Sequence, residues 1–125
     1  MIPGRLMPWM ESEEVLEKAI PHYIGNEYAA RILRATYGRP MSVQQISSQC
    51  DIPIAVAYRR VGEMERLGLI RCVRTEEVYR GKKMKFYSCA VRMVRYAFER
   101  GDFSIEIDWI PEEEMKRESE VGTEG

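Results

Sequence analysis

Positively charged side chains gather in two short stretches of the sequence, at Arg59 and Arg60 and at Arg80, Lys82 and Lys83. Guanidinium groups can donate paired hydrogen bonds to a guanine edge or a phosphate, and lysines bind phosphate as point charges. The less specific alternatives are a solvated helix face for the first stretch and an ordinary charged hairpin tip for the second. If the fold brings the two stretches together, they can bind a polyanion.

The overall charge of −1 conceals an uneven distribution along the 125 residues. Residues 31–100 hold 15 basic and 6 acidic residues, a net charge of +9. Residues 1–30 hold 2 basic and 5 acidic residues (−3), and residues 101–125 hold 2 and 9 (−7). A basic middle between acidic ends favours a polyanion partner for the middle. The acidic run at 112–114 predicts a solvated tail, with a DNA mimic that competes for the basic surface as the alternative.

Cysteine usage and hydropathy indicate a reducing, aqueous environment. The three cysteines, Cys50, Cys72 and Cys89, cannot all pair, and they show no CxxC spacing. They are predicted to be buried small hydrophobic residues in a cytoplasmic protein. No apolar run reaches the roughly 18–20 residues that span a bilayer, so we expect no membrane association.

Residue patterns typical of enzymes are missing from the sequence. It contains no P-loop, G-x-G-x-x-G, HExxH or GxSxG motif. One histidine, His22, and scattered cysteines make neither a catalytic triad nor a metal cluster. We therefore expect no catalytic residues, no metal and no cofactor.

Apolar periodicity and capping residues predict four helices, over about 12–20, 26–37, 43–49 and 53–67. Asn26 suits an N-cap, and Ser42 with Gln45 fits a capping box. The expected inward-facing residues are Tyr28, Ile32, Leu33 and Thr36, then Val43, Ile46 and Cys50, then Ala57, Val61 and Met64. A tight Asp51-Ile52-Pro53 connection joins the last two helices, and Pro53 suits a first helical turn.

Two β-hairpins are predicted after Gly68, where the apolar period changes from helical spacing to alternation. The first has arms 69–74 and 85–89 around a basic polar loop at 75–83. The second has arms 91–98 and 103–109, in which Val94, Tyr96 and Phe98 face the alternating apolar residues of the other arm. Residues 1–10 are predicted to be extended, 11–110 to form one domain, and 111–125 to be a disordered acidic tail.

The second helix of a tightly joined pair can enter the DNA major groove. The exposed face of helix 53–67 is predicted to carry Ala55, Val56, Tyr58, Arg59 and Arg60. The hairpin tip, with Arg80, Lys82 and Lys83, suits phosphate contact or minor-groove insertion of Arg80. Ser42, Gln44 and Gln45 open the preceding helix, whose terminal amides can meet a backbone phosphate.

Residues 41–46 and 52–70, ending in Leu67-Gly68-Leu69-Ile70, resemble the winged helix-turn-helix of ArsR-like transcriptional regulators of archaeal and bacterial type. The resemblance covers about 26–110. It implies an α+β fold, with a three-helix core, a β-hairpin wing and a C-terminal β-hairpin. It also implies binding of double-stranded DNA as a homodimer. The sequence departs from the family in having Ala55 and Val56 where Ser or Thr is usual, and in lacking the metal-sensing cysteine pair.

Two functions remain open on the sequence alone. The first is a DNA-binding transcriptional regulator, with helix 53–67 in the major groove and the wing at 75–85 on the phosphate backbone or in the minor groove. The alternative is a winged-helix protein-interaction module that does not read DNA, for which the apolar Ile54 and Val56 provide a surface.

Overall fold

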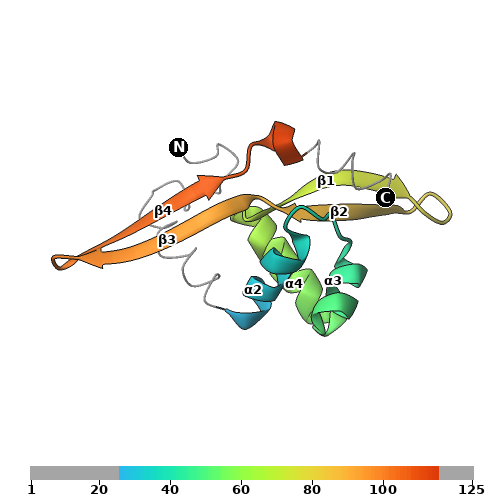
Figure 1. The fold of residues 1–125 in the computed structure, drawn as a ribbon. Helices are drawn as coiled ribbons and strands as arrows, with labels where there is room; N and C mark the ends of the chain where they lie inside the picture. Colours follow the sequence, from blue (N-terminus) through green and yellow to red (C-terminus); the bar gives the residue numbers. More distant parts are fainter. Residues whose placement is uncertain (1–25, 116–125) are drawn as a thin grey trace.

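Three helices precede two antiparallel hairpins in the computed structural model, which describes residues 26–115 (Figure 1). The helices are α2 (Glu27–Thr36), α3 (Val43–Cys50) and α4 (Ile54–Arg66). The hairpins are β1 (Ile70–Glu77) with β2 (Lys83–Cys89), and β3 (Val91–Glu99) with β4 (Asp102–Trp109). This order confirms the predicted α+β winged-helix architecture. The extended segment 1–10 and the helix at 12–20, like His22, lie outside the described residues.

The predicted helix caps form as the side-chain chemistry requires. The Asn26 carboxamide oxygen accepts hydrogen bonds from the amides of Tyr28 and Ala29, at 2.9 and 3.2 Å. The Ser42 hydroxyl accepts from the Gln45 amide at 3.2 Å, and the Gln45 side-chain oxygen accepts from the Ser42 amide at 2.9 Å. Such caps satisfy amides that have no partner inside the helix. Both caps were predicted and are confirmed.

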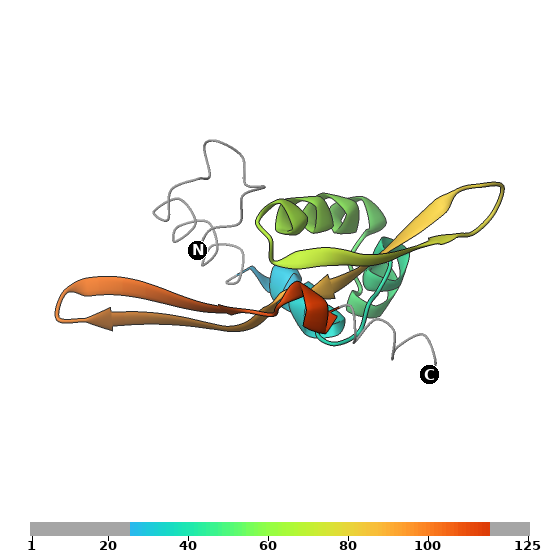
Figure 2. The same ribbon diagram turned by 90° about the horizontal axis from the view of Figure 1, so that it is seen from above.

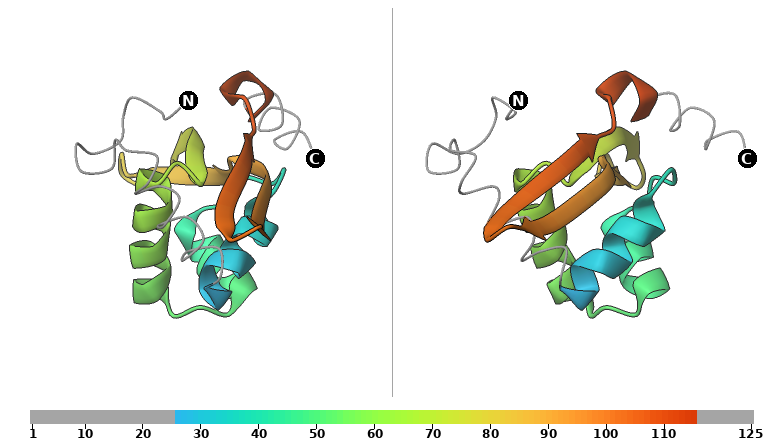
Figure 3. Two further views of the ribbon diagram at one scale, coloured as in Figure 1. Left: turned by 90° about the vertical axis from the view of Figure 1, so that its left-hand side faces the viewer. Right: turned by 60° about the vertical axis from the view of Figure 1, so that its left-hand side comes forward.

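The core lies where the three helices meet beneath the strands (Figure 3). One stripe of each helix is buried, namely Ala29, Ile32 and Thr36, then Val43, Ile46 and Cys50, then Ala57, Val61 and Met64. Spacings of three and four residues place each set on one helix face. The expectation that Tyr28 and Leu33 face inward is only partly met, because both are half-buried and Ala29 takes the interior position.

The strands of the first hairpin extend further than the sequence predicted. Residues 75–77 pair with Lys83, Met84 and Lys85, which shortens the loop to 78–82. Residues 75–77, Lys83 and Lys85 are polar and exposed, whereas Met84 is half-buried, so this end of the ribbon lacks the apolar alternation used to recognise a strand. We call this hairpin, residues 70–89, the wing.

The second hairpin has the predicted register. Val94, Tyr96 and Phe98 stand opposite Ile107, Ile105 and Phe103. A bulge follows Val91, where the ribbon leaves the core. We call this hairpin, residues 91–109, the arm; it and the wing project in opposite directions from the helices (Figure 2).

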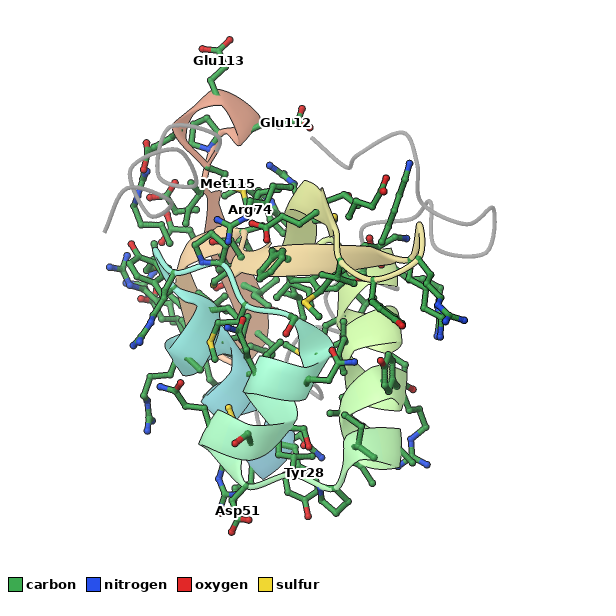
Figure 4. The ribbon with its side chains drawn as sticks, turned by 90° about the vertical axis from the view of Figure 1, so that its right-hand side faces the viewer. Tyr28, Asp51, Arg74, Glu112, Glu113 and Met115 are labelled. Carbon is green, nitrogen blue, oxygen red and sulfur yellow. The ribbon has the colours of Figure 1, made fainter. Side chains whose placement is uncertain are left out.

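Residues 112–115 form a helical turn, in a segment whose acidic composition predicts a disordered tail. Met115 is fully buried beside Ala90 and Ile110. The Arg71 guanidinium donates to the Ile110 carbonyl at 3.2 Å and lies 3.4 Å from the Met115 sulfur. Glu112 and Glu113 point away from the fold (Figure 4). The disordered tail is thus wrong for 111–115, and residues 116–125 lie outside the described part.

Candidate nucleic-acid interface

A groove of about 400 Å³ lies between the start of α3, the outer side of α4 and the wing. Its polar lining comes from all three elements, namely Gln44, Tyr58, Lys82, Lys83, Lys85 and Tyr87. The fold therefore brings together residues that are up to 43 positions apart in the sequence. We call this surface the basic groove.

A hydrogen bond between two helices fixes one wall of the basic groove. The Gln44 side-chain nitrogen of α3 donates to the Tyr58 hydroxyl of α4 at 3.2 Å. A hydroxyl that accepts one hydrogen bond still has its own proton to donate. The Tyr58 side chain is 52% exposed, so that proton can reach a phosphate outside the protein.

The wing tip is a tight turn with backbone in the left-handed region at Arg80 (φ 53°) and Gly81 (φ 74°). The turn is closed by the Lys82 amide, which donates to the Tyr79 carbonyl at 3.1 Å. Lys82 and the following Lys83 line the basic groove. Arg80 is not among the lining residues; its guanidinium carbon lies 5.2 Å from the centre of the Tyr79 ring. Lys82 and Lys83 thus belong to the basic groove, whereas Arg80 lies outside its lining.

The outer face of α4 differs in part from the prediction. Ala55, Tyr58 and Arg59 are exposed, as expected. Val56 is half-buried and packs against the core, and the Arg60 side chain is 21% exposed, with its guanidinium 3.6 Å from the Glu63 carboxylate. At 100° per residue, positions 56 and 60 flank the buried stripe, whereas 55 and 59 oppose it. Val56 and Arg60, which were predicted on the exposed face, therefore lie at its edges and are half-buried.

The residues that open α3 also divide into two groups. Ser42 is 1% exposed, and its hydroxyl and amide are both used in the capping box. Its side chain holds the helix start and is not a surface group. Gln44 and Gln45 are exposed, but the side-chain oxygen of Gln45 is occupied by the Ser42 amide. Gln44 is the member of this set that lines the basic groove.

Lys85, which follows the predicted hairpin tip, also belongs to the basic groove, although it is not among the predicted site residues. It is exposed on β2, two residues after Lys83. Side chains two positions apart on a strand point to the same face. That alternation could have added Lys85 to the site once the strand had been extended back to residue 83.

Tyr87 lines the groove from β2 and is 7% exposed. Burial raises the pKa of Tyr87 to about 12, and the negative charges of Glu65 and of ionised Cys72 and Tyr58 add to the shift. Its hydroxyl therefore stays protonated and neutral at physiological pH. The charge of the basic groove thus comes from its lysines.

Alkaline unfolding should report this buried tyrosine. The folded protein retains the Tyr87 proton between pH 10 and 12, where an unfolded tyrosine releases it, so the free energy of unfolding falls as pH rises through this range. A shift of this size corresponds to about 2–3 kcal/mol, with the full stability present below pH 10. Absorbance at 295 nm should show one late-ionising tyrosine that Tyr87→Phe removes. If all tyrosines of that variant and the parent titrate alike, the assignment is wrong.

Within residues 26–115, no group of three or more His, Cys, Asp or Glu side chains is arranged to hold a metal ion. Cys50 and Cys89 are buried, as predicted, whereas Cys72 is half-buried. Burial raises the pKa of the Cys50 thiol, although the nearby Arg31 charge opposes the shift. No helix in the same range has the length and hydropathy needed to cross a bilayer.

Comparisons with known proteins agree with this geometry. Residues 24–73 match the family described as a helix-turn-helix domain. The crystal structure of NolR from Sinorhizobium fredii has a TM-score of 0.50 to this fold at 16% sequence identity, covering 72% of this chain and 82% of NolR. A comparison with curated protein sequences gives no significant match. Residues 24–73, which include α2, α3 and α4, are therefore similar to a helix-turn-helix domain, and the described residues have a winged-helix fold.

Proposed function

We propose that this protein is a DNA-binding transcriptional regulator in which α4 enters the major groove and the wing contacts the phosphate backbone. The observation that carries this proposal is the basic groove, where Lys82, Lys83 and Lys85 of the wing face Tyr58 of α4 and Gln44 of α3. Phosphates that flank the major groove suit lysines and a tyrosine hydroxyl so placed. The helix-turn-helix match supports the same function.

Each exposed residue then has a separate role. Arg59 reaches a guanine edge or a phosphate, while the exposed Ile54 and Ala55 can make only apolar contacts, such as with thymine methyl groups. Arg80 at the wing tip inserts into the adjacent minor groove. Arg60 has a smaller part than the sequence implied, since its side chain is half-buried beside Glu63.

The finer assignments also belong to the proposal. The regulator is of the ArsR-like type without metal sensing, acts in the cytoplasm, and binds DNA as a homodimer. A symmetric dimer would present two α4 helices about 34 Å apart, to match half-sites one helical turn apart.

Binding of duplex DNA at several salt concentrations tests the function. Each phosphate neutralised by a lysine or arginine adds about −0.9 to the slope of log affinity against log salt. Contacts from the three groove lysines therefore predict a slope of about −2.7 or steeper. A flat dependence would contradict the phosphate contacts. Selection of bound sequences from random duplexes would then reveal the half-sites.

A protein-interaction module remains the second candidate, because Ile54 is 46% exposed at the start of α4, where a DNA reader usually has polar groups. Co-purification of a stoichiometric partner that covers α4, without duplex binding at about 0.1 M salt, would favour this candidate over the first.

A further inference from the structure

Three aromatic rings lie in contact on one face of the arm, far from the basic groove. The Tyr96 and Phe103 ring centres are 5.6 Å apart, and those of Phe98 and Phe103 are 4.7 Å apart. The residues are nevertheless 56%, 66% and 61% exposed for Tyr96, Phe103 and Phe98. We call these three residues the aromatic patch.

The structure around the aromatic patch explains why it is open. Nearer the base of the arm, Val94, Ile105 and Ile107 continue the same apolar face and pack partly against the core. Beyond them, β3 and β4 contact chiefly each other. A two-stranded ribbon is only marginally stable in water without a further layer on its apolar face. The outer part of the arm therefore has an apolar face without that layer among the described residues.

We infer that a second copy of this chain covers the aromatic patch, with the apolar faces of two arms packed together about a two-fold axis. This inference rests on the homodimer proposed above and names its contact surface. The patch has no charged group among its three side chains, so its partner must also be apolar. An identical arm offers such a surface with matching length, and a two-fold axis pairs identical patches.

The exposed area is sufficient for a dimer. Aromatic side chains bury roughly 150–250 Å² each, so the patch leaves roughly 300–400 Å² open on each copy. With the flanking aliphatic residues, two facing arms would cover on the order of 1,000 Å², near the lower end of specific interfaces. An apolar patch of this size is often functional, which agrees with a contact surface.

The opposite face of the arm has the composition of a solvent-facing surface. Arg95 pairs with Glu106 across the strands at 2.8 Å, and Ser104 and Asp102 are exposed beside them. Two copies would therefore meet through one defined face of each arm. Because the arm and the wing project in opposite directions (Figures 1 and 2), this contact leaves the basic groove open.

The test is the oligomeric state of the full chain, measured without DNA by analytical ultracentrifugation. We expect the parent protein to be a dimer and Phe103→Glu to raise the dimer dissociation constant at least about thirtyfold, because a charge would be buried at the centre of the contact. Ser104→Glu is the matched control. It adds the same charge one residue away on the opposite face, and it should leave the dimer intact.

Each result decides the inference. If Phe103→Glu and Ser104→Glu both stay dimeric, the homodimer stands but its surface lies elsewhere. A monomeric parent would overturn the dimer and the surface together, without bearing on DNA binding. Phe103→Lys is a second variant, used in case Phe103→Glu does not fold. It should dissociate the dimer equally, while its far-ultraviolet circular dichroism spectrum stays that of the parent.

Discussion

Replacing Lys82 and Lys83 together by alanine is expected to weaken binding to every duplex alike, by about 60-fold at 0.1 M salt. Both lysines line the basic groove from the wing and would contact phosphates, which are the same in all sequences. Loss of two contacts should also make the slope of log affinity against log salt shallower by about 1.8. Fluorescence anisotropy with one selected and one unrelated duplex, at four salt concentrations, gives both quantities.

The matched control removes two positive charges from the other end of the molecule. Arg95→Ala with Arg100→Ala changes the net charge equally, but both residues lie in the arm. This double variant should retain nearly all of the affinity at 0.1 M salt, since these charges lie far from the groove. Equal losses for the two double variants would mean that overall charge, and not the wing, determines binding. Arg59→Ala should differ from both by losing preference between sequences.

The largest effect on stability is expected at Leu69, between α4 and the wing. Its side chain is fully buried, its amide donates to the Met64 carbonyl at 2.9 Å, and its carbonyl accepts from the Ala90 amide at 2.8 Å. Leu69→Ala keeps the backbone bonds but leaves a cavity where α4 and the two hairpins converge. The free energy of unfolding should fall by about 2–5 kcal/mol, as measured by urea denaturation.

Ile54→Ala provides the comparison for a large aliphatic side chain outside the core. Ile54 is 46% exposed, so its truncation should cost less than about 1 kcal/mol. A similar loss at both positions would show that Leu69 is not the packing centre that its burial indicates. Because neither residue carries charge, the salt dependence of DNA binding should be unchanged in both variants.

Local patterns predicted the parts of the fold that depend on local physics. The Ser42–Gln45 capping box lies within four residues, and the alternation at 103–109 reports directly which side chains share a strand face. The order of helices and hairpins could therefore be predicted. The site could be predicted less well, since the half-burial of Arg60 depends on how α4 rotates against its neighbours.

The tail illustrates the same limit. Residues 111–115 look like the start of an acidic disordered segment, because Met115 follows one proline and three glutamates. Met115 becomes buried only because Ala90 and Ile110, 25 and 5 positions earlier, meet beside Arg71. Such a pocket is formed by distant residues, and no window of sequence around Met115 contains it.

The two hairpins share one continuous stretch of extended backbone. Strand β2 passes into β3 through the single residue Ala90, so residues 83–99 run the length of the molecule with no glycine or proline among them (Figure 1). Fully extended, 17 residues span about 56 Å. At the middle of this stretch, the Ala90 amide donates to the Leu69 carbonyl and the Ala90 carbonyl accepts from the Ile110 amide, both at 2.8 Å. The tip of the wing and the tip of the arm are therefore joined by one continuous stretch of extended backbone that is anchored to the rest of the fold at its middle.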